Sequence, residues 1–259
     1  MFDSIGFVGS GRIAHIMLGG WEKMGVALPA IYAYDQSVEA VDALRRSHFE
    51  VKAATLAEAS ACKLVFGALH PPAMGEVLAD IAPNLARDAL FCSLAPVLRL
   101  PALQEKLGGF SRLARLNPNA PSIVGVGYNP VSFSIGLPQD ARDSLLALLK
   151  PLGACPVVED AMIETYAAIS AMGPTYFWFQ FDELRRMAES FGMSEPAACK
   201  AIAGMLHGAV DTMFSNNLSA ERVMDLIPVR PMAADEPVIC GILQERIGGI
   251  HARLHPTIN

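Results

Sequence analysis

The chain has 259 residues and a formal net charge of −6 at pH 7, a length that suits two domains with a core each. Apolar residues make up 52% of it and charged residues 18%, which excludes an intrinsically disordered protein. The acidic balance, without any run of lysines or arginines, argues against a nucleic-acid partner.

The amino terminus and the cysteines indicate a cytoplasmic protein. The chain begins Met-Phe-Asp-Ser and enters a strand pattern at once, without the basic and apolar segments of a signal peptide. Its longest apolar-rich run, Tyr166–Phe181, is shorter than the roughly 20 residues that a membrane helix needs. The five cysteines stand far apart without a CxxC pair, so we expect neither a disulfide framework nor a zinc site.

The first half of the chain alternates short apolar segments with helical ones. Strands are predicted at Ser4–Val8, Ile31–Tyr34, Leu64–Leu69, Ala89–Ser93 and Ser111–Leu116. Helices are predicted at Ile13–Met24 and Val38–Ser47, and another can begin at Pro71. This alternation is typical of βαβ units, so residues 1–158 are predicted to form an α/β Rossmann domain, a parallel sheet with helices on both faces.

The pattern changes from Asp160 onward, where long helical segments follow without a convincing strand. These segments are Asp160–Ala171, Pro174–Gly192, Glu195–Asn216 and Ile239–Leu254. Residues 159–259 are therefore predicted to form an all-α domain.

The most informative chemical motif is the pattern Gly9-x-Gly11-x-x-Ala14. Gly9 permits a tight turn, Gly11 lets a pyrophosphate approach the backbone, and Ala14 lets the helix pack against the strand. The pattern follows a predicted strand and precedes a predicted helix, the context that distinguishes a dinucleotide-binding turn from an ordinary one. The predicted phosphate contacts at this helix N-terminus are Gly9, Ser10, Gly11, Arg12 and Ile13.

Asp35 ends the second predicted strand. An acidic side chain there accepts hydrogen bonds from the ribose hydroxyls and repels a 2′-phosphate, which favours NAD. Alternatively, Asp35 serves only as a turn or helix cap. Because Arg12 could reach a phosphate of either cofactor, the predicted cofactor is NAD or NADP, with NAD preferred.

Further motifs, taken with the glycine turn, resemble segments of one enzyme family. Gly6 to Ala14 resembles a GFIGGGNMA turn, and Ala68-Leu69-His70-Pro71 resembles AVKP. Arg115-Leu116-Asn117-Pro118-Asn119-Ala120-Pro121 resembles R-x-MPNTP, and Ser170-Ala171-Met172-Gly173-Pro174-Thr175-Tyr176 resembles SGSGPAY. In this order and spacing, the motifs resemble the pyrroline-5-carboxylate reductase family over nearly the whole chain.

This resemblance implies a Rossmann domain followed by a helical dimerisation domain, with the active site between them. It implies a homodimer or larger homo-oligomer through the C-terminal helices, and a role in proline biosynthesis. The residues that would line the nicotinamide half of the cofactor site are Ala68, Leu69, His70, Pro71, Ala95 and Asn119. The residues that would line the substrate pocket are Ser170, Gly173, Pro174 and Thr175.

The substrate loop departs from the family pattern. An SPGGTT-like loop is expected before the last helix, but Leu226 to Ala234 reads LIPVRPMAA, without a Gly-Gly turn or a pair of hydroxyls. Arg230 in this loop could bind a substrate carboxylate in a bidentate manner, or it could be a solvated surface residue. His70 replaces the lysine of AVKP and could donate a proton to substrate, or it could only hydrogen-bond the cofactor or backbone.

The sequence therefore predicts an NAD(P)H-dependent reductase that transfers hydride to the C=N bond of a small cyclic imino acid. The alternatives are a reductase of another imine or keto acid and a non-catalytic dinucleotide-binding regulatory protein. A deazaflavin-dependent NADP reductase is less consistent with Asp35 and the long helical half. No metal is expected, because His251 and His255 have no third ligand beside them.

Overall fold

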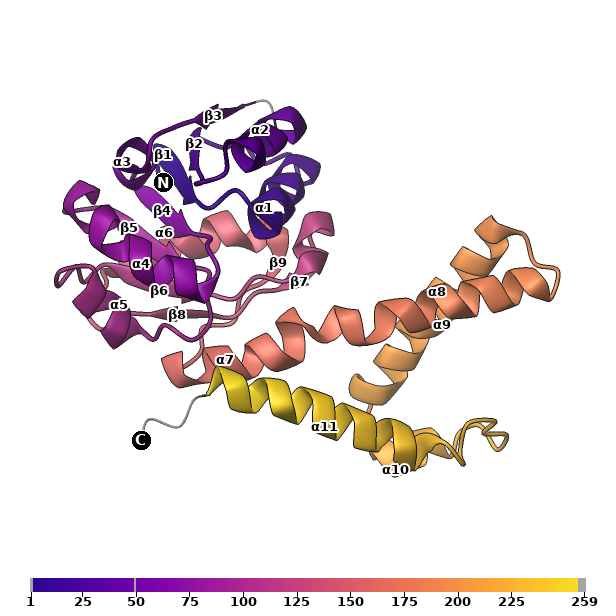
Figure 1. The fold of residues 1–259 in the computed structure, drawn as a ribbon. Coiled ribbons are helices and arrows are strands. Elements are labelled where there is room, and N and C mark those ends of the chain that lie inside the picture. Colours follow the sequence, from indigo (N-terminus) through magenta and orange to yellow (C-terminus); the bar gives the residue numbers. More distant parts are fainter. Residues whose placement is uncertain (1, 49, 256–259) are drawn as a thin grey trace. The chain divides into compact units, whose positions relative to one another are not determined.

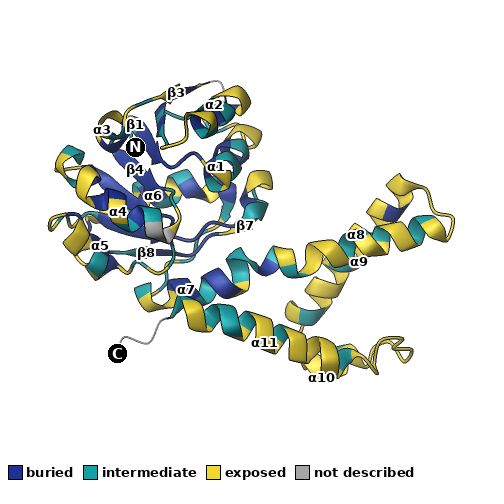
Figure 2. Ribbon diagram, viewed as in Figure 1, coloured by how far each residue is buried: buried dark blue, intermediate teal, exposed yellow. Residues whose placement is uncertain are grey.

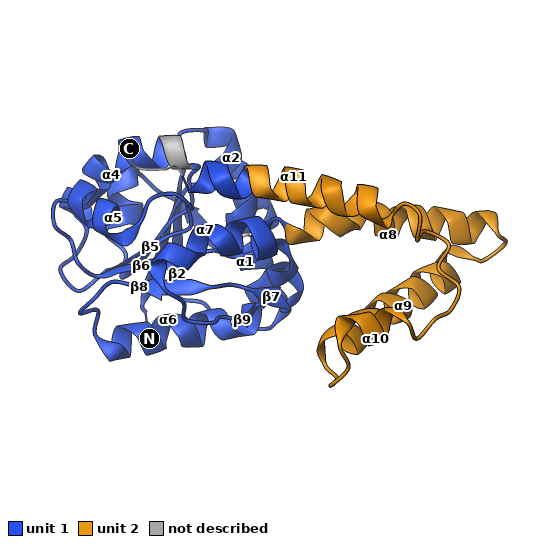
Figure 3. Ribbon diagram, turned by 90° about the horizontal axis from the view of Figure 1, so that it is seen from below, with its two compact units in different colours: residues 1–172, 250–259 blue, residues 173–249 orange. Residues whose placement is uncertain are grey.

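The computed structural model describes residues 2–48 and 50–255. The chain divides into two compact units (Figure 3). Residues 1–172 and 250–259 form the Rossmann unit, and residues 173–249 form the helical unit.

The Rossmann unit is built on a seven-stranded sheet in the order β3-β2-β1-β4-β5-β6-β8 (Figure 1). Its strands are β1 (Ser4–Val8), β2 (Ala30–Tyr34), β3 (Val51–Ala53), β4 (Leu64–Gly67), β5 (Leu90–Ser93), β6 (Leu113–Leu116) and β8 (Val131–Phe133). All neighbours are parallel except β6 and β8. The strand order reverses between β1 and β4, and ligands of open α/β sheets bind at the carboxyl end of such a switch point.

Helices cover both faces of the sheet. They are α1 (Arg12–Lys23), α2 (Val38–Ser47), α3 (Leu56–Ser60), α4 (Pro71–Ile81), α5 (Leu100–Lys106) and α6 (Gln139–Leu149). Short 3-10 turns lie at Ala82–Asn84, Ala120–Val124, Lys150–Leu152 and Asp160–Met162, and the small strands β7 (Gly127–Tyr128) and β9 (Gly153–Ala154) pair with each other.

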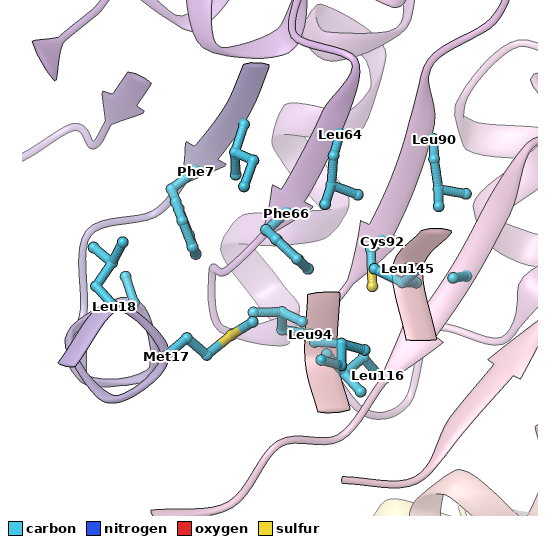
Figure 4. Close-up of a cluster of buried hydrophobic side chains, with 14 of the residues drawn as sticks. Phe7, Met17, Leu18, Leu64, Phe66, Leu90, Cys92, Leu94, Leu116 and Leu145 are labelled. Carbon is cyan, nitrogen blue, oxygen red and sulfur yellow. The ribbon is translucent and has the colours of Figure 1, made fainter. Parts of the chain in front are cut away.

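The core on one face joins β1 and β4 to helix α1. Phe7 and Phe66 stack with ring centroids 5.1 Å apart, and Met17 and Leu18 of α1 pack in the same cluster (Figure 4). Trp21 is fully buried beside them, and its indole N–H donates to the Leu148 carbonyl at 2.8 Å. Each such aromatic side chain removes a large apolar area from water, so this cluster fixes the helix that follows the glycine turn.

The end of the Rossmann unit is an irregular helical segment. It runs from the 3-10 turn Asp160–Met162 through α7 (Ile163–Tyr166) into a π-helical turn at Ala167–Ala171. The sequence predicts one continuous helix here, and the structure corrects that prediction, because the π-turn inserts an extra residue into the hydrogen-bond ladder.

The helical unit contains α8 (Gly173–Ser190), α9 (Glu195–Phe214), α10 (Ala220–Met224) and most of α11 (Glu236–Leu254), which ends in the Rossmann unit. Only Gly173 and Ala198 are buried among residues 173–249 (Figure 2). Large apolar side chains stand exposed instead, including Phe179, Phe191 and Phe214. This unit therefore has almost no core within one chain.

The Rossmann sheet followed by helices confirms the predicted fold class. The sequence missed β3, β7, β8 and β9, which are too short to show a clear pattern. The domain boundary at residues 158 and 159, where strands give way to helices, stays a prediction; the compact units divide further along, at residues 172 and 173. Within residues 2–48 and 50–255, no helix is long and apolar enough to cross a membrane.

Candidate active site

The glycine turn after β1 forms an open cradle. Gly9 has φ +112°, and a Cβ there would lie 2.6 Å from the Ala68 carbonyl oxygen, so only glycine fits. A Cβ on Gly11 would meet nothing within 4 Å. None of the described residues accepts a hydrogen bond from the backbone N–H of Gly11, Arg12 or Ile13. These donors stand at the N-terminus of α1, where the helix dipole favours an anion.

The cradle opens into a cleft of about 520 Å³ at the carboxyl ends of β1, β2 and β4. The residues that line it are Gly11, Arg12, Ile13, Asp35, Gln36, Ala68, Leu69, His70 and Ala73. Seven of these nine are residues that the sequence predicts for the cofactor. The sequence missed Gln36 and Ala73. The only sequence signal for Gln36 is that it follows Asp35, and the only one for Ala73 is that it lies in the first turn of α4.

Asp35 is both a lining residue and a structural tie. Its Oδ2 accepts from the Ser10 backbone N–H at 2.8 Å, and its Oδ1 accepts from the Ser37 N–H at 3.0 Å. The turn role that the sequence leaves open is therefore present, whereas the N-cap of α2 is Ser37, whose hydroxyl accepts from the Ala40 N–H. A carboxylate has about four acceptor positions, so capacity remains for hydroxyl groups in the cleft.

Ser10 supplies a further polar atom at the cradle. It is 2% exposed, and none of the described residues forms a hydrogen bond with its hydroxyl oxygen. These features fit a nicotinamide dinucleotide. Its pyrophosphate would lie on the unpaired backbone N–H groups at Gly11, where no side chain blocks the approach, and a ribose would lie near Asp35.

His70 forms part of the cleft wall. It precedes α4 in an extended conformation, is exposed, and does not cap the helix with its side chain. Its imidazole is therefore available to a ligand. Pro71 opens α4, and its side chain lies outside the described part of the chain.

Ala95 and Asn119 do not line this cleft. Ala95 is buried, with its N–H 3.3 Å from the Ser93 hydroxyl. Asn119 is 6% exposed; its Oδ1 accepts from the Tyr128 N–H at 3.0 Å, and its Nδ2 donates to the Ser170 carbonyl at 3.2 Å. Asn119 thus joins the loop after β6 to the π-helical turn.

The proposed substrate residues are divided between the units. Ser170 lies in the π-turn of the Rossmann unit, and its hydroxyl donates to the Tyr166 carbonyl at 2.9 Å. Gly173, Pro174 and Thr175 begin α8 in the helical unit. Arg230 is exposed in the same unit, and its Nη2 donates to both carboxylate oxygens of Glu236 at 2.6 Å. Arg230 is thus already paired with a carboxylate of its own chain.

The sequence missed a buried ion cluster around Arg115. This side chain is 0% exposed and donates to Asp160 Oδ1 at 2.7 Å and to Glu164 Oε1 at 2.5 Å. The same Glu164 oxygen accepts from the Val97 N–H at 3.2 Å. The only signal in the sequence was the arginine of the R-x-MPNTP-like segment, since its partners lie far along the chain.

The two histidines of α11 stack on each other, with ring centroids 4.2 Å apart. His251 Nε2 also lies 3.2 Å from the Thr165 hydroxyl. Over residues 2–48 and 50–255, no three His, Cys, Asp or Glu side chains are placed to hold a metal ion.

Comparison with known proteins finds relatives that match most of this chain. Residues 4–96 match the family model described as NADP oxidoreductase coenzyme F420-dependent. The chain is 28% identical over 231 residues to a pyrroline-5-carboxylate reductase from Escherichia coli, covering 88% of this chain and 85% of that protein. It is 26% identical over 210 residues to pyrroline-5-carboxylate reductase 3 from Bos taurus, covering 81% and 68% respectively.

This chain resembles pyrroline-5-carboxylate reductases over most of its length. The resemblance that its motifs indicate is thereby confirmed.

Solved structures show the same fold. The Plasmodium falciparum pyrroline carboxylate reductase with NADP bound superimposes with a TM-score of 0.82 at 17% identity, covering 97% of this chain and 96% of that one. A pyrroline-5-carboxylate reductase from Coxiella burnetii gives a TM-score of 0.70 at 21% identity, covering 98% and 96%. The family-model match does not favour a deazaflavin substrate, because it covers only the part of the Rossmann unit that holds the glycine turn.

Proposed function

We propose that this chain is an NAD(P)H-dependent reductase of a small cyclic imino acid, with pyrroline-5-carboxylate as the nominal substrate. The observation that carries the proposal is the cleft in which the glycine turn, Asp35 and the Ala68–His70 segment meet. The similarity to pyrroline-5-carboxylate reductases along most of the chain supports the reaction class.

The bound cofactor would supply a hydride to the imine carbon, and the nitrogen would gain a proton, so that C=N becomes CH–NH. The turn at Gly9 to Ile13 would hold the pyrophosphate through the backbone N–H groups of Gly11, Arg12 and Ile13, because those of Gly9 and Ser10 already donate to Tyr34 and Asp35. Leu69 and Ala68 supply an apolar wall. Such a reaction depends chiefly on holding the two reacting carbons together, because little acid–base chemistry is required.

His70 is the proposed proton donor on the cleft wall. An imidazole can give and take a proton near neutral pH, and this one is exposed to the cleft rather than used as a helix cap. The competing role is a hydrogen bond to the cofactor or backbone alone. His70→Gln keeps that hydrogen bond but cannot transfer a proton, so a large loss of kcat in this variant would favour proton transfer.

The proposed cofactor preference is NAD over NADP. Asp35 lines the cleft at the end of β2, where its negative charge disfavours a 2′-phosphate. Its two hydrogen bonds to Ser10 and Ser37 hold the carboxylate in this position.

The proposed assembly is a homodimer or a larger homo-oligomer formed through the helical unit. Large apolar side chains such as Phe179, Phe191 and Phe214 are exposed on this unit, which has almost no core of its own. Extensive exposed apolar surface marks an interaction site. Static light scattering should give the mass of two or more chains, whereas a monomer at micromolar concentration would contradict this assignment. We further propose a cytoplasmic location and a role in making proline.

The deciding experiment measures oxidation of NADH and NADPH with pyrroline-5-carboxylate, alongside binding of both cofactors. Turnover would establish the function, with His70 and Arg230 as the first residues to vary. Cofactor binding without turnover would move the search to other imines and keto acids. Binding without turnover on the whole panel would favour the non-catalytic, dinucleotide-binding role. Absence of binding would contradict the proposal.

A further inference from the structure

A buried amide without a hydrogen-bond partner lies at the edge of the sheet. Asn117 is 6% exposed, and none of the described residues accepts a hydrogen bond from its side-chain Nδ2. Buried amides are almost always paired, because an unpaired donor loses its hydrogen bonds to water without compensation. Asn117 therefore requires an explanation beyond folding.

The position of Asn117 places it at the same edge as the cofactor cleft. It directly follows β6, and its N–H extends the ladder to the Pro130 carbonyl at 3.0 Å. In the parallel pairing of β5 with β6, Ser93 lies opposite Arg115. The same register continued by two residues sets Asn117 opposite Ala95.

The neighbouring strand links this position to the cleft wall. The Leu94 N–H donates to the Gly67 carbonyl at 2.9 Å, and Ala68, the next residue after Gly67, lines the cleft. Asn117 thus lies two strands from the Ala68–His70 wall. At this edge all the parallel strands present their carboxyl ends, the place where α/β proteins bind their ligands.

None of the described side chains on the same face of β6 accepts a hydrogen bond from the amide. Side chains alternate along a strand, so Asn117 and Arg115 point to one face. Two carboxylates bond Arg115 on this face, and neither accepts from Asn117: Glu164 Oε1 accepts from Arg115 and the Val97 N–H, and Asp160 accepts from Arg115 and the Leu100 N–H. Glu164 Oε2 is itself buried and unpaired.

The loop that follows β5, the strand paired with β6, holds a strained residue. Val97 has φ +85°, a conformation that a β-branched residue rarely adopts, and its N–H is held by Glu164. Strained backbone and unpaired buried polar atoms concentrate at binding sites. Here the two occur in the segments that follow the paired strands β5 and β6.

We propose that the Asn117 side-chain amide is a ligand-binding donor that recognises an oxygen acceptor, a carbonyl or carboxylate group of the bound cofactor or substrate. The inference rests on the proposed function and adds a specificity-determining residue to it. The R-x-MPNTP motif has methionine at this place, so the family pattern supplies no side-chain donor here. Asn117 would give this chain a polar contact to compensate for its missing SPGGTT-like loop.

The test compares Asn117→Leu, which has a similar shape without the donor, with Asn117→Met, the residue of the motif. Ser60→Ala is the matched control, since the Ser60 hydroxyl is also fully buried and unpaired but ends α3, ahead of the amino end of β4. The measurements are the Kd of NADH, the Kd of L-proline for the NAD-loaded chain, KM and kcat with pyrroline-5-carboxylate, and Tm.

We expect about a tenfold loss, equivalent to about 1.4 kcal/mol, in one binding step for both Asn117 variants and no loss for Ser60→Ala. A weaker Kd for NADH assigns the acceptor to the cofactor; a higher KM and a weaker Kd for L-proline, with NADH binding intact, assign it to the substrate. Tm should not fall, because the substitution removes an unpaired buried donor.

Two results would overturn the proposal in distinguishable ways. If the wild-type chain binds NADH and both Asn117 variants match it in every Kd and in KM, the inference fails while the proposed function stands. A wild-type chain that binds neither NADH nor NADPH would remove the proposed function and this inference with it.

Discussion

The carboxylate of Asp35 accepts a hydrogen bond from the backbone N–H of Ser10 at 2.8 Å. This bond joins the end of β2 to the turn that follows β1, so one side chain shapes the phosphate cradle and lines the cleft beside it. The proposed cofactor selectivity would therefore be coupled to the geometry of the turn through a single residue.

Replacing Asp35 with asparagine should shift selectivity toward NADPH. The amide oxygen can still accept from the Ser10 N–H, but the negative charge that repels a 2′-phosphate is gone. We expect the ratio of NADPH to NADH affinity to rise about tenfold. Fluorescence titration of both cofactors would measure it, with Asp42→Asn on α2 as the control. An unchanged ratio would contradict the assignment of Asp35 to the ribose.

Gly11→Leu should abolish binding of NADH without loss of stability. Its side chain would extend into open space, because a Cβ at Gly11 meets nothing within 4 Å, yet it would cover the backbone donors of the cradle. Gly9→Ala is the informative comparison. Its methyl group would lie 2.6 Å from the Ala68 carbonyl oxygen at a φ of +112°, so this variant should lose Tm as well as NADH binding. Calorimetry measures the stability of each variant, and cofactor titration measures its NADH affinity. If Gly11→Leu kept the NADH affinity of wild type, the glycine turn would not be the pyrophosphate site.

Removing Glu164 should destabilise the Rossmann unit strongly. Arg115 is completely buried, and breaking a buried ion pair by deleting one partner costs about 3–5 kcal/mol. Urea unfolding of Glu164→Ala should show this loss, and Arg115→Met with Glu164→Leu should recover part of it, because no fully buried charge is then left unpaired; Asp160, which loses Arg115, is 22% exposed and keeps the Leu100 N–H. Equal midpoints for Glu164→Ala and wild type would show that the cluster contributes nothing.

Val97→Gly should raise thermal stability. A non-glycine residue at φ +85° stores about 1–3 kcal/mol, of which the greater freedom of glycine in the unfolded chain offsets about 0.5–1 kcal/mol. The expected gain is about 1 kcal/mol, measured as a rise in Tm. Val38→Gly, at the start of α2, should instead lower Tm, and a loss of similar size at Val97 would mean that the loop is not strained.

Acid should weaken the fold partly through His15. Burial, and then the neighbouring His48, lower the pKa of His15 below 6.5. The unfolded chain therefore takes up this proton at a higher pH than the folded chain, so the stability due to neutral His15 is full above pH 6.5 and is lost as pH falls through the folded pKa.

His15→Gln removes this dependence, so urea midpoints of the variant should fall less steeply than those of wild type below pH 6.5. Glu22, which lies 2.8 Å from His48 Nδ1, is unchanged in both proteins and contributes equally. Parallel pH profiles would exclude His15 as a source of the acid sensitivity.

Most residues that line the cleft are ones that the sequence singles out, because their signal is local. Gly9 and Gly11 follow β1, and Asp35 follows β2. Because these two strands belong to one βαβ unit and pair in parallel, residues close in sequence determine that the three positions lie together. Asn119 was harder, since its partners Tyr128 and Ser170 are placed only by the tertiary fold.

The same limit applies to the ion cluster and to the substrate loop. A fully buried Arg115 cannot be distinguished from a solvated one without knowing that Asp160 and Glu164 pack against it. Arg230 was predicted as a possible carboxylate ligand, and nothing in the local pattern indicated that Glu236, six residues on, would pair with it.

The chain leaves the Rossmann unit after residue 172 and returns to it at residue 250. The helical unit is thus an insertion and not a simple appendage, although in sequence it looks like the second half of the protein. Any truncation that begins within it also strips the last helical turns from the nucleotide-binding half. An exchange that replaces residues 173–249 with the helical segment of a relative would keep residues 1–172 and 250–259 intact. Helical units could therefore be swapped between relatives without redesigning the sheet.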